Sequence, residues 1–305
     1  MSPAKSLGPT LEDHVPNNKL NLIAIGPAGA GKSVGLLHIA QFVKKPVLYI
    51  SLDGRITSTF RYLEKRAPQL RKRIVPKRFS MSQYEKMSDY LESVDEREIG
   101  ALFVDPLWSA GAMLIEYSIS MRADSSSEDG GTGKKRRGSH RGVIDMPQMD
   151  DYKVETRGLN LLLDQGARIP GHFLMAAHYI VTQDTKVEVV DGKQVTTKEE
   201  KTQVLVAGQQ IAAAIPALFD EVWFIQQQSD GADTSKDPKR MVYMKPSSAK
   251  PFLKTSHMDT LPMSLNWTGK LLFDTQVVAG GATVGQTLGL IPVSDEEWND
   301  NNKQP

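Results

Sequence analysis

The chain has 305 residues, and its 37 lysines and arginines almost balance its 36 aspartates and glutamates, which leaves a formal net charge of +1. A chain so close to neutrality is not a polycation, so any contact with nucleic acid must come from a local basic patch. The absence of cysteine excludes disulfides, thiol catalysis and zinc–thiolate sites. The N-terminus lacks the apolar stretch of a signal peptide, and no apolar run is long enough to span a bilayer. We therefore expect a cytoplasmic protein with no membrane partner.

Apolar runs and helical patterns alternate along most of the chain. Residues 1–19 are rich in Pro, Asn and charge, and we expect a flexible leader there. Buried strands are predicted at residues 20–25, 46–53, 99–105, 172–180, 221–226 and 240–245. Helices are predicted at residues 34–43, 57–73, 82–94 and 151–168. Strands that alternate with helices predict the α/β fold class, here a mostly parallel, twisted sheet with helices on both faces.

We interpret residues 20–275 as one domain that contains two long loops. The first loop is residues 106–150, in which residues 122–142 combine Gly, Ser and charge and predict a mobile segment. Beyond this domain, residues 276–305 are rich in Gly and then acidic around Trp298. That composition indicates a solubilising tail, and the alternative is a docking segment for a recombination partner.

The second long loop is residues 182–207, which are mostly polar. Within it, the sequence EVVDGKQV predicts a β-hairpin that turns at Asp191 and Gly192, because Asp-Gly is a favoured pair in two-residue hairpin turns.

The segment GPAGAGKS, residues 26–33, follows the first predicted strand and matches the Walker A pattern in full. Its glycines let the backbone turn with amide groups pointing inward around a β-phosphate, and Lys32 places a cation beside the β- and γ-phosphates. The hydroxyl of Ser33 can bind Mg²⁺, and the following helix offers its positive N-terminal end to the same anion. The predicted nucleotide-binding residues are Gly26, Pro27, Ala28, Gly29, Ala30, Gly31, Lys32, Ser33 and Val34. We expect ATP and Mg²⁺ as cofactors, and no motif in the sequence distinguishes ATP from GTP.

Two predicted strands end in carboxylates that can serve this site. The run ALFVD ends at Asp105, where an open α/β sheet binds its ligands, so Asp105 is the second predicted Mg²⁺ ligand; the alternative is an aspartate that begins a turn before Pro106. Because Pro106 stands where many ring ATPases carry a catalytic carboxylate, the hydrolytic base must come from another strand. Asp53 can orient or deprotonate the attacking water, unless Asp53 and Gly54 form an ordinary turn.

The order of these parts resembles the RecA-type ATPase core, and most closely the phage RecA-like nucleotide-binding proteins associated with single-strand annealing and recombination. The resemblance covers residues 20–252. It rests on the Walker A segment, on Asp53, on the strand that ends at Asp105, and on the segments FLMAAHYI, VAGQQIAAAIPALFDEVWFI and RMVYMKPSSAKPF. It implies a P-loop ATPase, located in the host cytoplasm if the gene belongs to a phage.

The resemblance also implies roles for individual residues. Asp53 falls where RecA-type proteins place the catalytic glutamate, and His178 falls where they place a polar residue that senses the γ-phosphate. Lys245 falls where RecA-like filaments present a lysine to the nucleotide of the neighbouring subunit, which implies a homo-oligomer, either a ring or a filament. With Lys32, these residues form the expected catalytic set. The alternative for His178 is a histidine at a strand end whose hydrogen bonds are satisfied within the fold. The alternative for Lys245 is a solvated lysine before Pro246.

RecA-like proteins bind single-stranded DNA with two loops, one after the strand that carries the metal-binding aspartate and one after the strand that carries the γ-phosphate sensor. In this sequence the two loops correspond to residues 106–150 and 182–207. The first loop contains the basic run KKRRGSHR, enough charge to neutralise several phosphates. The expected DNA contacts are Lys134, Lys135, Arg136, Arg137 and Arg141. The run carries no interleaved aromatic side chains, and the alternative is a solvated loop.

The expected function is that of an ATP-dependent single-stranded DNA-binding protein acting in recombination or annealing, with hydrolysis stimulated by DNA or oligomerisation. Two alternatives remain open. One is an ATP-driven DNA motor of the helicase or packaging type, and the other is a non-catalytic, nucleotide-dependent assembly switch.

Overall fold

The fold is described from a computed structural model. The described residues are 19–54, 56–128, 147–190, 193–206, 208–228, 239–248, 250–267, 271–277 and 281–302. Among these residues, no helix combines the length and the apolar character needed to cross a membrane.

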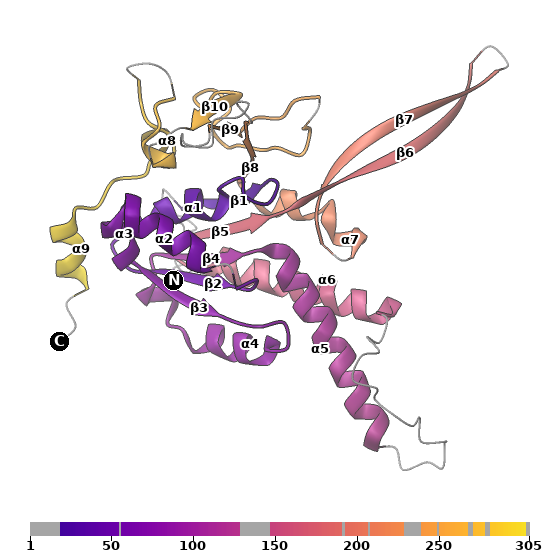
Figure 1. Cartoon of the computed structure of the whole chain (residues 1–305), viewed down its shortest axis with the longest axis horizontal. Helices are drawn as coiled ribbons and strands as arrows, with labels where there is room; N and C mark the ends of the chain where they lie inside the picture. Colours follow the sequence, from indigo (N-terminus) through magenta and orange to yellow (C-terminus); the bar gives the residue numbers. More distant parts are fainter. Residues whose placement is uncertain are drawn as a thin grey trace, which may run out of the picture.

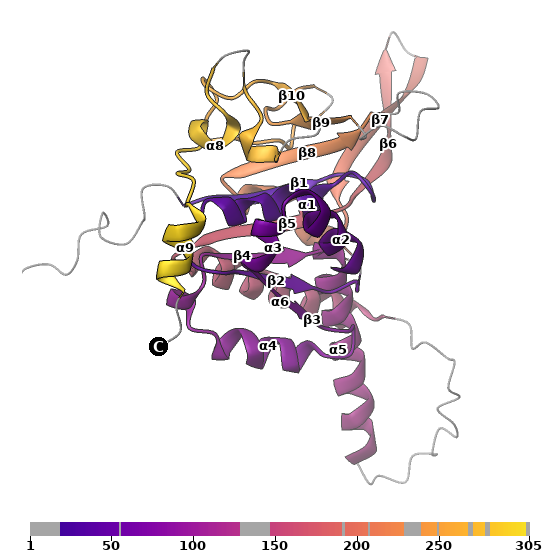
Figure 2. The ribbon, with the colours of Figure 1, turned by 60° about the vertical axis from the view of Figure 1, so that its left-hand side comes forward.

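An eight-stranded sheet forms the centre of the molecule, in the order β10-β9-β8-β1-β5-β4-β2-β3, and Figure 2 shows the strands stacked in this order. The strands are β1 (Asn21–Ile25), β2 (Val47–Ser51), β3 (Ile74–Arg78), β4 (Ala101–Asp105), β5 (His172–Ala177), β8 (Glu221–Gln227), β9 (Arg240–Tyr243) and β10 (Ser264–Trp267). From β8 to β3 all neighbours are parallel, whereas β9 and β10 are added antiparallel. The predicted α/β class with a mostly parallel sheet is confirmed.

Helices cover both faces of the sheet, so the central strands are buried on both sides. In β1, Leu22 and Ala24 join the hydrophobic core on one face, while Ile23 and Ile25 join the core on the other. The first core is covered by α1 (Lys32–Leu37), η2 (His38–Gln41), α2 (Ile56–Arg66) and α3 (Pro68–Lys72). The second is covered by α4 (Tyr84–Ser93), α5 (Leu107–Glu128), α6 (Met149–Arg168), α7 (Gln209–Ala212) and η4 (Ile215–Leu218). Burial on both faces explains why these strands are continuous apolar runs.

The predicted long loop at residues 106–150 is wrong for most of the part that the structure describes. Helix α5 begins directly after Pro106 and continues through Glu128, and α6 begins at Met149. The two helices pack closely because Gly158 presents no side chain: a Cβ at this position would lie 2.3 Å from Cδ2 of Leu114. The far half of α5 extends away from the body of the molecule (Figure 1).

Residues 182–207 also differ from a loop. Strands β6 (Tyr179–Val190) and β7 (Lys193–Val204) form a separate two-stranded antiparallel sheet, which projects from the body (Figure 1). The predicted hairpin is confirmed, since Val190 pairs with Lys193 on either side of the predicted turn. The two turn residues themselves lie outside the described residues.

The C-terminal segment packs on the core, so the expected solubilising tail at residues 276–305 is wrong for the described parts, residues 276–277 and 281–302. Helices α8 (Val284–Thr287) and α9 (Asp295–Asn301) lie here, and Val284 is fully buried in the first core. The amide of Val293 donates to the carbonyl of Gln41 at 2.8 Å. The expected leader lies outside the described residues, apart from residue 19.

Candidate nucleotide-binding site

The candidate phosphate-binding loop, residues 26–33, connects β1 to α1 through a backbone that favours glycine at three points, of which Gly26 and Gly31 also lie in close contact with neighbouring residues. Gly26 follows β1 so closely against β8 that a Cβ there would lie 2.1 Å from the carbonyl oxygen of Ile225. Gly31, which precedes the first residue of α1, has a φ of 89°, in the left-handed region. The amide of Gly26 donates to the carbonyl of Ala177 at 3.2 Å, which ties the loop to the end of β5.

Lys32 is folded back over this loop. Its side chain is only 5% exposed, and its Nζ donates to the carbonyls of Gly26 and Pro27 at 2.9 and 2.8 Å. The ammonium group therefore lies at the centre of the loop, as the Walker A pattern requires of a cation for the β- and γ-phosphates.

Asp105 is buried beside the start of α1. Tyr49 in β2 donates its hydroxyl to Oδ2 of Asp105 at 2.9 Å. Burial raises the pKa of Asp105, while hydrogen bonds with Ser33 and Tyr49 act in the opposite direction. Burial, followed by the charge of Asp105, raises the pKa of Tyr49, so this phenol stays a donor. A cation at Asp105 would offset the cost of burying its charge.

The donor set at this position fits Mg²⁺ bound together with a phosphate. Ser33 and Asp105 supply one hydroxyl and one carboxylate that interact with each other. The described part of the chain contains no cluster of three or more His, Cys, Asp or Glu side chains that would hold a metal by itself, at this site or at any other. Mg²⁺ commonly takes one or two protein ligands and completes its shell with phosphate oxygens and water, so the residues present suit it.

Most of the predicted site residues line one cavity of about 340 Å³, although Gly26, Pro27 and Ala30 of the loop do not. Its lining consists of Ala28, Gly29, Gly31, Lys32, Ser33, Val34, Tyr49, Asp53, Ser58, Thr59, Tyr62, Asp105, His178 and Arg240. The strand order explains this convergence: β2, β4, β5 and β1 are neighbours, and their carboxyl ends meet at one edge of the sheet. Asp53 is exposed two residues after β2, and His178 lies between β5 and β6.

Two predicted sets of residues are not part of this cavity. Lys245 follows the end of β9, which runs antiparallel to β8 and therefore away from the phosphate-binding edge. Its expected contact is with a neighbouring subunit and stays a prediction. The expected DNA contacts between residues 134 and 141 lie outside the described residues.

Several residues of the cavity were not predicted. Arg240 begins β9 and reaches the phosphate-binding loop, and Tyr49, Ser58 and Tyr62 also line the site. Tyr49 is one apolar-looking position within a buried strand, so its pattern gives no sign of a polar role. Arg240 comes to the site only because β9 starts at the edge where the parallel strands end, as its pairing with Gln227 shows.

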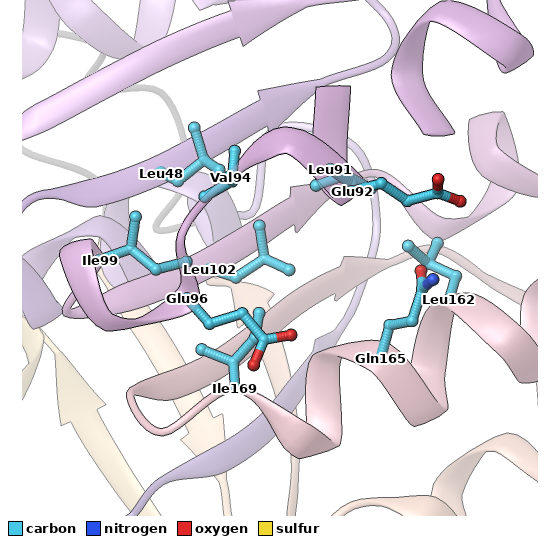
Figure 3. A pocket seen from close by; sticks show the side chains of 10 residues that line it. All are labelled: Leu48, Leu91, Glu92, Val94, Glu96, Ile99, Leu102, Leu162, Gln165 and Ile169. Carbon is cyan, nitrogen blue, oxygen red and sulfur yellow. The ribbon is translucent and has the colours of Figure 1, made fainter. Parts of the chain in front are cut away.

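A second cavity, of about 210 Å³, lies apart from this site on the face of the sheet covered by α4 and α6 (Figure 3). Leu48, Leu102 and other apolar side chains line it, and Glu92, Glu96 and Gln165 carry its polar groups. None of the phosphate-loop residues contributes to it. It is therefore not an extension of the nucleotide site.

Comparison with known proteins adds distant structural similarities only. No protein-family model matches the sequence, and no curated protein matches it. Among solved structures, the RadB recombinase is similar at 13% identity with a TM-score of 0.38, over 76% of this chain and 83% of that protein. A KaiC-like protein from the hyperthermophilic archaeon Pyrococcus horikoshii is similar at 12% identity with a TM-score of 0.40, over 78% of this chain and 84% of that protein. Similarities this distant do not identify a function.

Proposed function

We propose that this protein is a RecA-like P-loop ATPase that binds single-stranded DNA in an ATP-dependent manner and acts in recombination or annealing. The observation that carries this proposal is the convergence of Lys32, Ser33, Asp53, Asp105 and His178 around one cavity at the carboxyl edge of a parallel sheet. Each of these side chains has the chemistry that phosphoryl transfer to water requires.

The proposed chemistry assigns one task to each group. The loop amides and Lys32 bind the β- and γ-phosphates, and Ser33 with Asp105 would hold Mg²⁺. When bound, Mg²⁺ would neutralise part of the negative charge on the phosphate oxygens. Asp53 is an exposed residue that lines the cavity, and it can accept a proton from an attacking water or orient that water.

His178 is the proposed link between nucleotide and DNA. It lines the cavity, and β6 of the projecting hairpin begins at the next residue. The carbonyl of His178 also accepts from the amide of Leu205, just after β7, so both strands of the hairpin are anchored at this point. A hydrogen bond from His178 to a γ-phosphate would therefore change the position of the residues at the base of the hairpin. In this proposal the hairpin and the basic run at residues 134–141 contact DNA.

Assembly is the remaining part of the proposal. Lys245 would reach the nucleotide of an adjacent subunit in a homo-oligomer and stabilise charge during phosphoryl transfer. Its place outside its own subunit's cavity is compatible with a role in the neighbouring site.

ATP turnover with and without single-stranded DNA tests the proposal directly. We expect DNA to raise the turnover of the wild-type protein, and Lys32→Ala to lower it by about 100-fold or more, because a buried cation at the reacting phosphates is lost. Lys153→Ala is the matched control, since Lys153 is an exposed lysine on α6. No turnover and no salt-dependent DNA binding by the wild type would remove the proposal.

Shortening the hairpin tests its role in DNA binding. Gln183 pairs with Glu200, so residues 184–199 can be replaced by Asn-Gly without changing the register of the remaining strands. We expect nucleotide affinity to stay within about twofold of wild type, while DNA stimulation of turnover falls sharply. Unchanged DNA stimulation in this variant would assign DNA binding to another element.

A non-catalytic switch is the second candidate. One observation favours it: the candidate base is Asp53, whose side chain is shorter than that of glutamate and which is exposed. A protein of this kind would bind ATP tightly, show negligible turnover, and behave identically when Lys245 is replaced by alanine.

A further inference from the structure

Arg240 approaches the candidate phosphate-binding loop from the side opposite Asp105. In the sheet, β4 and β2 lie on one side of β1, and β8 and β9 lie on the other. Asp105 and Asp53 follow from the first pair of strands, whereas Arg240 begins β9. The side chain lies directly against Gly31, because a Cβ at that glycine would be 2.6 Å from Nε of Arg240.

The guanidinium group is held in place by an aromatic ring. Its central carbon lies 4.9 Å from the ring centroid of Trp267, in β10. Trp267 is only 1% exposed and packs beside α1, since a Cβ at Gly35 would lie 3.0 Å from the ring. Stacking on a fixed ring lowers the conformational entropy that the arginine loses when it binds a ligand.

The chemistry of this group suits a phosphate chain. Guanidinium keeps its proton at any accessible pH and presents parallel N–H donors that match two phosphate oxygens. Arg240 lines the same cavity as Lys32 and enters it from β9, whereas Asp105 ends β4 on the other side of β1, and a guanidinium group has no acceptor atom for a metal ion. It can therefore add a cation to the site without taking part in metal binding.

We infer that Arg240 is a second cationic contact for the phosphate chain of the nucleotide, and that it acts independently of Mg²⁺. This inference rests on the proposed function only in requiring that a nucleotide binds at the phosphate loop. It assigns Arg240 to affinity for the nucleotide itself, in both its diphosphate and triphosphate forms, and leaves the metal to Ser33 and Asp105.

The test measures binding of a fluorescently labelled ADP to the full chain, once with Mg²⁺ and once with EDTA. We expect Arg240→Gln to weaken binding by about 10- to 100-fold in both conditions, as loss of a charge-assisted hydrogen bond predicts. Asp105→Asn should weaken binding only when Mg²⁺ is present. Arg240→Lys should fall between the wild type and Arg240→Gln, because it keeps the charge and loses the paired donors. Arg157→Gln, on the exposed surface of α6, is the control and should bind as the wild type does.

The outcomes separate this inference from the proposed function. A wild type that does not bind ADP at all overturns both. If the wild type and Arg240→Gln bind ADP equally well, only the role of Arg240 is overturned. The same holds if Arg240→Gln binds ADP more weakly than the wild type with Mg²⁺ but equally well in EDTA. Thermal unfolding without nucleotide shows whether each variant folds. If Arg240→Gln does not fold, Arg240→Lys provides the comparison of ADP binding with Mg²⁺ and with EDTA.

Discussion

Gly31 couples the backbone of the phosphate loop to the side chain of Arg240. Its φ of 89° is a conformation that side chains with a Cβ rarely adopt, and the space where a Cβ would lie is filled by Arg240. Gly29 has a similar φ of 77°, yet a Cβ there would meet no atom within 4 Å. The two glycines thus differ in one respect, the neighbour that a side chain would displace.

This difference gives a prediction with an internal control. Gly29→Ala and Gly31→Ala should each lower the free energy of unfolding by about 1–3 kcal/mol, because both force alanine into the left-handed region. Only Gly31→Ala should also push Arg240 from its position, so it should weaken ADP binding in EDTA more than Gly29→Ala does. The measurements are urea unfolding and ADP titration. Equal binding by the two variants would show that the contact with Arg240 has no effect on the nucleotide.

The cavity residues that a single sequence predicts are those that end parallel strands. Asp53, Asp105 and His178 each follow an apolar run, and parallel strands bring their carboxyl ends to one edge. Arg240 begins its strand, and Lys245 follows the end of the same strand. Because β9 is antiparallel to β8, the start of β9 reaches the cavity and its end does not. The direction in which a strand joins a sheet is not visible in the composition of that strand.

One buried arginine supplies several of the contacts that attach the end of the C-terminal segment. Arg73, which follows α3, is only 3% exposed and donates to the carbonyls of Ala40 and Val293 at 3.2 and 3.0 Å. It also pairs with Asp295 at 2.6 Å and lies 5.7 Å from the ring centroid of Trp298. These contacts join η2, α3 and α9, which are far apart in the chain.

Replacing Arg73 should therefore loosen the part of this segment around α9. Arg73→Met leaves two buried carbonyls without their donor, and we expect it to lower the free energy of unfolding by about 2–4 kcal/mol. Asp295→Asn, which changes the exposed partner of the same pair, should cost no more than about 1 kcal/mol. Limited proteolysis between residues 281 and 302 reports this loosening. Equal effects of the two variants would mean that the ion pair, and not the carbonyl contacts, holds the segment.

The prediction of a solubilising tail at the C-terminus was wrong for a physical reason. An acidic run such as SDEEWNDNN has the composition of a solvated tail, and its partner Arg73 is 222 residues away from Asp295. The hairpin of β6 and β7 was predictable because its turn and both flanks are contiguous. The edge strand β3 was hidden for a third reason: most of its residues are not buried, so its basic sequence gave no apolar run.

Two buried histidines accept hydrogen bonds in the neutral form: His38 joins η2 to η5 (Leu272–Asp274), and His172 joins the start of β5 to the residue before β1. Nδ1 of His38 accepts from the amide of Leu272 at 2.8 Å, and Nδ1 of His172 accepts from the amide of Leu20 at 3.0 Å. Burial, and then the charge of Arg240, lowers the pKa of His38 to about 3. Burial, and then the charge of Lys19, lowers the pKa of His172 to about 4. Both folded-state pKa values lie below the ordinary value of 6.5.

Acid should therefore destabilise the fold in a defined window. Well above pH 6.5, for example at pH 7.5, both histidines are mostly neutral in the folded and unfolded states, and their contribution to stability is almost complete. Below pH 6.5 the unfolded chain takes up protons that the folded protein does not, so each histidine lowers the free energy of unfolding by about 1.4 kcal/mol per pH unit until the folded pKa is reached. Urea unfolding at pH 7.5 and pH 5 measures this loss.

His38→Asn isolates one of the two contributions, because the amide oxygen of asparagine can accept the bond from Leu272 and does not titrate. Whatever the substitution costs at pH 7.5, the loss of stability between pH 7.5 and pH 5 should be smaller than in the wild type by about 2 kcal/mol. His172→Asn should act in the same direction, and the two effects should add, since the histidines contact different elements. If both variants lose as much stability as the wild type over this range, the acid sensitivity of the fold lies in other groups, and the histidines are only packing residues.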